Sequence, residues 1–292
     1  MHARLSRASC QSCYHRCVKH YDCHTHVNFA AFSEDVDVVM DRARQSGVGM
    51  NIVGTQFDTS SSAVALAGRY DHAWATIGLH PIHTGRSYHD EKELGEGGEA
   101  FTSRGEAFDA ARYRELARSP KVVAIGECGL DYYRLDEGTK KIQEEAFMAQ
   151  IALSKELDKP LMLHVRSSHG TQDAYADVLA ILARAGVRGD VHFFAGDWAT
   201  ARAFLDIGFT LSFTGVVTFT HDYDEVVKNA PLDMILTETD APYITPAPHR
   251  GKRNEPSHIP LIAQAIARIR GEDEAHVRER LAENARRVFR FA

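Results

Sequence analysis

The stretch YDCHTHV at residues 21–27 places an aspartate and two histidines on alternate positions, with a cysteine between them. In a β-strand, side chains on alternate positions point to the same face, so Asp22, His24 and His26 would share one face. Cys23 would then point to the other face. Imidazole and carboxylate groups can hold a metal ion or move protons. We therefore expect the imidazoles to carry chemistry and the thiol to serve in packing.

Further side chains that could ligate a metal or handle protons occur later in the chain: His80, Glu127, His164, His192 and Asp240. Each lies near the C-terminal end of a short apolar run or just after it. Together with the first stretch, these runs give eight candidate strands: Tyr21–Val27, Val48–Val53, Ala75–Leu79, Val122–Ile125, Leu161–Val165, Asp190–Phe194, Phe209–Phe213 and Met234–Thr237.

Helical patterns lie between the candidate strands. Apolar residues recur at helical spacing from Ile142 to Leu157, and a last long helix is expected from about Ile259 to Gly271. Strands that alternate with helices favour parallel pairing, and eight such units fit a single α/β domain, a (β/α)8 TIM-type barrel. In such a barrel the C-terminal strand ends meet at one rim, where active sites form.

The side chains at these strand ends favour a shared metal site. One histidine alone is commonly a hydrogen-bonded packing residue, but burying several imidazoles and carboxylates together needs a cation to offset their desolvation. With no thiolate facing the site, the ligand types suit zinc, manganese or magnesium. Four histidines and two carboxylates exceed the needs of one tetrahedral ion, whereas two ions bridged by a carboxylate would use them all. Such a pair of ions activates water, which indicates hydrolysis without specifying the bond.

Six motifs occur in order along the chain: DCHTH (22–26), GLHP (78–81), AIGECGLDYY (124–133), LHVR (163–166), HFFAG (192–196) and TETDAPYITPAPHRGKRNEP (237–256). Together they resemble the TatD family of metal-dependent deoxyribonucleases, over residues 21 to about 291. The last motif is the most specific to that family. The resemblance implies a metal-dependent nuclease on a TIM barrel, with DNA as its substrate.

The resemblance also implies roles for individual residues. The first metal ion would be held by His24, His26 and Asp240. Glu127 would bridge to a second ion, which His164 and His192 would hold. As the catalytic carboxylates, Asp240 would take the proton from the attacking water and Glu127 would join the two ions.

Contacts with substrate are expected from basic residues near the rim: Arg166, Arg250, Lys252 and Arg253. The run HRGKR could equally be a solvated surface turn. Phosphate contact is favoured because guanidinium groups bind phosphate in bidentate fashion and the chain is otherwise acidic. His80 is expected to shape the pocket or contact substrate, and not to ligate a metal.

Two other functions compete with a DNase. A deacylase or lactonase of the amidohydrolase type could use the same metal rim, since barrels of this kind support both chemistries. A non-enzymatic barrel that binds DNA or a partner would be expected to lack a ligand, and none is lost here. The identity of the metal, the preference for DNA or RNA, and endonuclease or exonuclease action stay open.

Two regions depart from the family pattern. Residues 85–110 form a Gly- and acid-rich insertion, expected to be a mobile surface loop at the active rim. Residues 1–20 form a leader with Cys10, Cys13 and Cys17, which could bind zinc or an iron–sulfur cluster. An unstructured extension before a barrel domain at 21–292 is favoured, because this spacing without a second C-x2-C is a weak signal.

Composition excludes several classes of protein. The chain has 292 residues, 44% hydrophobic and 25% charged, with a net charge of −6, so it offers no overall basic surface for nucleic acid. It lacks an apolar run of membrane-spanning length and a secretory h-region, and its five cysteines do not suggest a disulfide framework. A cytoplasmic monomer without a protein partner is the expectation.

Overall fold

Strands and helices alternate along the chain in the computed structural model, which describes residues 18–86, 88–89, 101–133 and 138–291. In these parts of the chain, eight parallel strands pair in sequence order and form a nearly closed barrel. They are β1 (His20–Thr25), β2 (Val48–Val53), β3 (Ala73–Ile77), β6 (Val122–Asp131), β7 (Leu161–Arg166), β8 (Gly189–Val191), β9 (Thr210–Phe213) and β10 (Ile235–Thr237). The predicted (β/α)8 barrel is confirmed.

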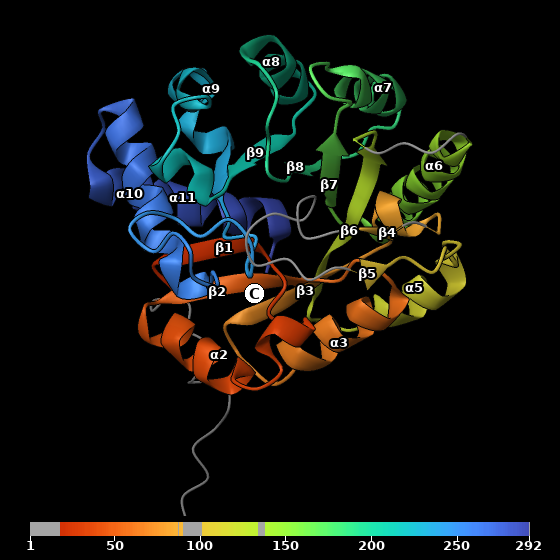
Figure 1. The fold of residues 1–292 in the computed structure, drawn as a ribbon, viewed down its shortest axis with the longest axis horizontal. Coiled ribbons are helices and arrows are strands. Elements are labelled where there is room, and N and C mark those ends of the chain that lie inside the picture. Colours follow the sequence, from red (N-terminus) through yellow and green to blue (C-terminus); the bar gives the residue numbers. More distant parts are fainter. Residues whose placement is uncertain (1–17, 87, 90–100, 134–137, 292) are drawn as a thin grey trace, which may run out of the picture.

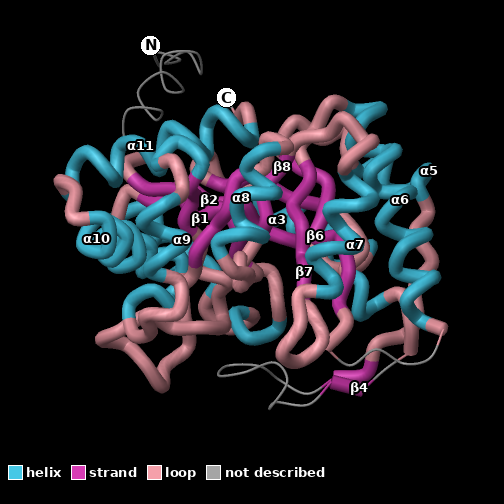
Figure 2. The backbone as a smooth tube through the Cα atoms, turned by 90° about the horizontal axis from the view of Figure 1, so that it is seen from above, coloured by secondary structure: helices cyan, strands magenta, loops and turns pink. Residues whose placement is uncertain are grey.

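Helices surround the strands on the outside of the barrel (Figures 1 and 2). They are α2 (Val36–Gln45), α3 (Phe57–Ala67), α5 (Ala110–Leu116), α6 (Thr139–Leu157), α7 (Asp173–Leu182), α8 (Trp198–Asp206), α9 (Asp224–Asn229), α10 (Ile259–Arg270) and α11 (Glu274–Phe289). Helix α10 ends where Gly271 adopts a left-handed conformation with φ of 66°. The expectation that this helix is the last one was wrong, because α11 follows it.

The barrel closes between its first and last strands by a short set of hydrogen bonds. The segment after β10 pairs with β1 at a single bridge, Thr25 with Ala241. The backbone N–H of Asp240 donates to the carbonyl of His24 at 2.9 Å, and the N–H of His26 donates to the carbonyl of Ala241 at 2.7 Å. Closure therefore brings three predicted metal ligands from opposite ends of the chain side by side.

The apolar core has two parts. The larger part lies between the strands and the surrounding helices, and the smaller part fills the barrel at the N-terminal ends of the strands. In the smaller part, the rings of Tyr21 and Trp74 each pack against Phe291, with centroids 4.4 Å apart. Among the described residues, side chains plug this end, and the cavity lies at the opposite end of the barrel.

Strand β6 is irregular next to the predicted ligand Glu127. The register of β6 against β7 shifts between Gly126 and Cys128, and β6 continues to Asp131, so the prediction that this strand ends at Ile125 was wrong. Gly126 has φ of 148°, and a Cβ there would lie 2.3 Å from the Met162 carbonyl oxygen, so only glycine fits. The bulge turns Glu127 into the mouth of the barrel.

The insertion at residues 85–110 begins and ends in described structure. Strand β4 (Tyr88–His89) pairs antiparallel with β5 (Phe101–Thr102), apart from the barrel. Residues 90–100 and the leader cysteines Cys10, Cys13 and Cys17 lie outside the described residues. In the described parts of the chain, no helix has the length and apolar character needed to span a membrane.

Candidate metal centre

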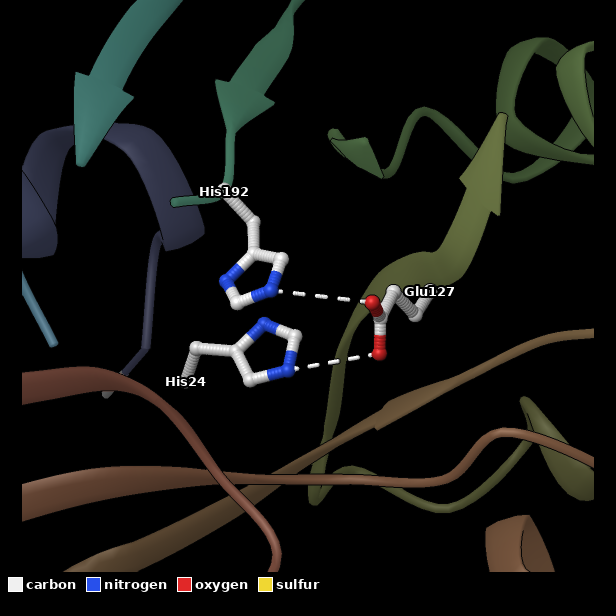
Figure 3. A group of neighbouring side chains, drawn as sticks. All are labelled: His24, Glu127 and His192. Atoms are coloured by element: carbon white, nitrogen blue, oxygen red, sulfur yellow. Dashed lines mark ion pairs between the residues drawn. The ribbon is translucent and has the colours of Figure 1, made fainter. Parts of the chain in front are cut away.

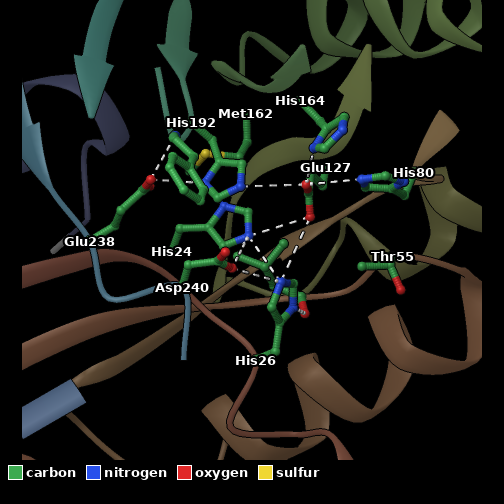
Figure 4. Close-up of polar contacts among 12 residues, drawn as sticks. His24, His26, Thr55, His80, Glu127, Met162, His164, His192, Glu238 and Asp240 are labelled. Carbon is green, nitrogen blue, oxygen red and sulfur yellow. Dashed lines mark hydrogen bonds and ion pairs between the residues drawn. The ribbon is translucent and has the colours of Figure 1, made fainter. Parts of the chain in front are cut away.

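The six predicted ligands meet at the open end of the barrel (Figure 4). They come from five strands or the residues just after them: β1 provides two, and β6, β7, β8 and β10 provide one each. All are buried except His164, which is half-buried. They are His24, His26, Glu127, His164, His192 and Asp240. Side chains from both ends of the sequence thus converge on one small volume.

We call His24, His26 and Asp240 the HxH group. The Nε2 atoms of the two histidines lie 3.1 Å apart, and Oδ1 of Asp240 lies 3.8 and 3.5 Å from them. Ligand atoms bound to one tetrahedral zinc ion lie about 3.4 Å apart, given bond lengths near 2.1 Å. The donor set and its spacing therefore fit a divalent cation.

Glu127 lies between this group and a second set of histidines (Figures 3 and 4). Its Oε2 is 3.3 Å from His24 Nε2. Its Oε1 is 2.9 Å from His164 Nδ1 and 3.6 Å from His192 Nε2. One carboxylate oxygen therefore faces each set, which is the arrangement that a bridging carboxylate between two ions requires.

Two carboxylates support the second set of histidines from behind. Asp131 Oδ2 accepts a hydrogen bond from His164 Nε2 at 2.9 Å, and Glu238 Oε1 lies 3.0 Å from His192 Nδ1. We call these four residues the carboxylate-backed group. Each carboxylate favours a proton on the ring nitrogen that faces it, so the other nitrogen can bind a metal ion once its own proton has left.

Sequence reasoning missed Asp131 and Glu238. Both stand inside quoted motifs, GLD at 129–131 and ETD at 238–240. The only available signal was a carboxylate near a predicted site position: Asp131 lies four residues after Glu127, and Glu238 lies two residues before Asp240. The contact of each carboxylate with a histidine on another strand depends on the tertiary structure and could not be predicted from the sequence pattern.

The tautomer of His80 argues against metal ligation. Its Nδ1 accepts a hydrogen bond from the N–H of Ile82 at 3.1 Å, so the neutral ring carries its proton on Nε2. Nε2 lies 3.2 Å from Glu127 Oε1 and donates to it. By contrast, His26 Nδ1 donates to the Val53 carbonyl at 3.0 Å, which leaves its Nε2 lone pair directed at the HxH group.

The carboxylates of the centre stay ionised. Burial alone would raise the pKa of Glu127, but the imidazoles of His80 and His24 hold it well below its ordinary value. Burial likewise opposes ionisation of Asp240, yet the hydrogen bond with His26 and the nearby His192 lower its pKa. Both groups are therefore anions at neutral pH, as metal ligands must be.

The histidines divide by charge. Burial, with the neighbouring His192, lowers the pKa of His24, and burial beside His164 lowers that of His80 to about 4. Burial would also lower the pKa of His192, but Glu238 raises it to about 10. The pKa of His164 is raised, because hydrogen bonds with Asp131 and Glu127 outweigh burial.

The prediction that Asp22, His24 and His26 share a face was wrong for Asp22. The register of β1 shifts between Asp22 and Thr25, which interrupts the alternation. The carboxylate of Asp22 accepts hydrogen bonds from the N–H and hydroxyl of Thr239 and helps to close the barrel. Cys23 packs in the barrel interior with its Sγ 3.5 Å from Glu238 Oε2. Burial raises the pKa of this thiol, so it stays protonated.

The predicted basic residues lie in different surroundings. Arg166 lines a cavity of about 360 Å³ above the metal centre, together with His80. Arg250 donates to the carbonyl of Thr245. Arg253 donates to the Ala31 carbonyl and to the Asp35 carboxylate. Of the four, Arg166 alone lines the cavity, and Lys252 is exposed.

Backbone strain gathers at the cavity wall. Three residues that line it have positive φ without being glycine: Phe193 (45°), Asp240 (52°) and Ile244 (52°). Such conformations each cost of order 1–3 kcal/mol and persist where the surrounding structure enforces them, typically at functional sites. Phe193 is held in part by its N–H, which donates to Glu238 Oε1 at 2.6 Å.

The chain is similar to known proteins over almost its whole length. A family model described as TatD related DNase matches residues 21–290. YabD of Bacillus subtilis, an uncharacterized metal-dependent hydrolase, is 38% identical over 277 residues, 93% of this chain and 99% of that protein. The 3'-5' ssDNA/RNA exonuclease TatD of Yersinia pseudotuberculosis is 36% identical over 280 residues, 93% of this chain and 99% of that protein.

A solved structure shares the fold. The TatD homologue YJJV of Escherichia coli matches with a TM-score of 0.78 at 24% identity, over 94% of this chain and 99% of that one. The family model and both relatives extend over nearly the whole barrel. The chain therefore belongs to the TatD related DNase family and is a metal-dependent hydrolase.

Proposed function

We propose that this protein hydrolyses phosphodiester bonds of single-stranded nucleic acid, using two divalent ions held by His24, His26 and Asp240 and by His164 and His192. The observation that carries the proposal is the position of Glu127, with one oxygen facing each set of histidines. A carboxylate so placed suits two ions that share a bridge, the arrangement typical of phosphoester hydrolysis.

Bound divalent ions would supply Lewis acidity and lower the pKa of water at the site. The chain supplies the rest. Asp240, an anion at neutral pH, takes the proton of the attacking water at a carboxylate oxygen. His80 keeps a proton on Nε2, 3.2 Å from Glu127 Oε1, and this N–H can donate to a phosphate oxygen instead when bound ions engage Glu127.

Arg166 binds the substrate phosphate. Its guanidinium is a cation beside a cavity whose other charged groups are mostly carboxylates, so a polyanion needs it to enter. The cavity of about 360 Å³ is the size of a small-molecule site, which favours one strand over a duplex. The relative from Yersinia pseudotuberculosis, named an exonuclease for single strands, supports the same substrate.

The test is a substrate panel on protein stripped of metal and reloaded with magnesium, manganese or zinc. The nucleic-acid substrates are an oligodeoxynucleotide labelled at its 5′ or 3′ end, the same oligodeoxynucleotide annealed to its complement, and an RNA of the same sequence. A lactone and an aryl ester are tested as two further substrates. We expect metal-dependent loss of the single strand, with the two labels reporting the direction of cleavage.

An Asp240→Asn variant purified in parallel controls for contaminating nucleases. Full cleavage in excess chelator, with metal analysis showing none bound, would contradict the proposal. Hydrolysis of the lactone or ester with no cleavage of any oligonucleotide would show instead that the metal centre serves a deacylase or lactonase.

A further inference from the structure

Two aromatic rings stand exposed at the open end of the barrel. Among the described residues the exposed large apolar side chains include two aromatic ones, Tyr133 at 40% and Phe219 at 45% exposure. Tyr133 follows β6, and Phe219 follows the short 3₁₀ turn after β9. Isolated exposed apolar residues are common on proteins, so exposure alone carries no function.

Each of these rings is covered on one side by an arginine. The guanidinium carbon of Arg166 lies 3.8 Å from the ring centroid of Tyr133, and that of Arg250 lies 4.0 Å from Phe219. A third arginine shows the contrast: Arg253 lies over a fully buried ring, Phe32, which makes that contact part of the core. The first two pairs instead present a cation and an exposed ring together.

Both pairs are connected to the cavity. The N–H of Tyr133 donates to Asp131 Oδ1 at 3.0 Å, and the other oxygen of Asp131 holds His164. On the other side, Arg250 donates to the carbonyl of Thr245, which directly follows a residue of the cavity wall. In the strand order β6-β7-β8-β9-β10, the pairs lie on either side of β8, whose end provides His192.

We propose that Tyr133 and Phe219 are stacking platforms for the bases of a single strand, while Arg166 and Arg250 contact its phosphates. This inference rests on the proposed nuclease function and specifies how that site selects its substrate. An aromatic ring next to a cation is the combination that holds unpaired bases without reading sequence. Bases in a duplex are already stacked on each other, so only an unpaired strand can use both platforms.

The experiment compares an oligothymidylate with an abasic oligomer of the same length, cleaved by the metal-loaded enzyme. Tyr133→Leu and Phe219→Leu keep apolar bulk but remove the ring, whereas Tyr133→Phe and Phe219→Tyr keep it. We expect each leucine variant to raise KM for oligothymidylate roughly 5- to 100-fold, the range that base stacking typically contributes. The ring-retaining variants should restore wild-type KM.

Two readouts separate stacking from mere support of the arginines. For the abasic oligomer, Tyr133→Leu should leave KM unchanged, because no base is present to stack. The slope of log affinity against log salt should also stay at its wild-type value, because no phosphate contact is lost. Met148→Ala, which truncates a 60% exposed side chain on α6, is the matched control and should change KM for neither oligomer.

Equal losses on both substrates, or a reduced salt slope, would overturn the inference and leave Tyr133 as a support for Arg166. Unchanged KM in both leucine variants would overturn it as well. If the wild-type enzyme cleaves the abasic and base-containing strands equally well, the nuclease function is supported and the proposal of stacking platforms is contradicted. If it cleaves neither strand, the proposed function fails and this inference fails with it.

Discussion

The HxH group and the carboxylate-backed group hold their histidines by different means. In the HxH group, His26 is fixed by a backbone carbonyl, and the ring of His24 is packed against His192, with centroids 3.5 Å apart. In the carboxylate-backed group, each histidine contacts a carboxylate through one ring nitrogen: His164 contacts Asp131, and His192 contacts Glu238. One group is therefore positioned by packing and the other by charge.

This difference sets the charge of each group before metal binds. Burial keeps His24 neutral, so the HxH group can bind an ion without first losing a proton there. The carboxylates behind His192 and His164 raise the pKa of both imidazoles, so a proton must leave when an ion binds. We expect the two groups to differ in metal affinity and in its dependence on pH.

The largest expected effect concerns the HxH group. Asp240→Asn keeps the shape and one possible ligand oxygen but removes the negative charge and the base. We expect turnover to fall at least ~10²-fold, as for loss of a general base. The measurement is the cleavage rate at matched metal occupancy, because loss of a ligand would otherwise imitate loss of the base. Wild-type turnover at full occupancy would remove Asp240 from the proton transfer.

The next effect isolates the carboxylate-backed group. Glu238 accepts from the Phe193 N–H through one oxygen and from the Ser212 hydroxyl through the other, so Glu238→Gln must turn an amide NH2 toward one of these donors. We expect one of two bound ions to weaken roughly 10- to 100-fold, the usual cost of removing such a support. Calorimetric titration with zinc measures both ions. Equal weakening of both would show that the groups are not independent.

The pH dependence of metal binding should separate the groups further. Because the pKa of His192 is about 10 in the metal-free protein, its ring is protonated below that pH and competes with the ion. Affinity at the carboxylate-backed group should rise with pH, roughly tenfold per unit for each proton released, between about pH 6 and 8. Titrations in buffers of different ionisation enthalpy count the protons. No proton release would contradict the charged state of His192.

A smaller effect is expected from the basic loop than from the cavity arginine. Arg166→Ala should lower the slope of log affinity for an oligonucleotide against log salt by roughly one unit. Arg250→Ala combined with Lys252→Ala should lower it by less than about one unit, because neither side chain lines the cavity. Arg253→Ala is the control, because its guanidinium is engaged with Asp35. An unchanged slope in the double variant would show that this loop is a solvated surface turn that does not contact phosphate.

The smallest effect is expected at Cys23. Its thiol donates a weak hydrogen bond to Glu238, and a serine hydroxyl can donate the same bond. Cys23→Ser should therefore leave turnover close to that of the wild type, measured beside Asp240→Asn under the same conditions. An inactive Cys23→Ser variant with normal metal content would show that the Cys23 thiol takes part in the reaction.

Local sequence pattern was enough to predict the barrel and to place the predicted ligands near its rim. Alternating apolar runs and helical stripes indicate parallel strands, and the ends of parallel strands meet at one rim, so His164 and His192 could be placed together from chain order alone. Residue type then limited the chemistry, because imidazole and carboxylate together suit a divalent ion.

Local pattern could not predict the details that depend on bulges and on contacts between distant strands. The shifts in β1 and β6 break the two-residue period, so the period misplaced Asp22 and could not show how Glu127 reaches both groups. The pairing of Asp131 and Glu238 with histidines depends on the register between strands, which local pattern does not encode. Whether a strand forms a bulge depends on how its side chains pack in the whole barrel, and the local sequence pattern does not contain that information.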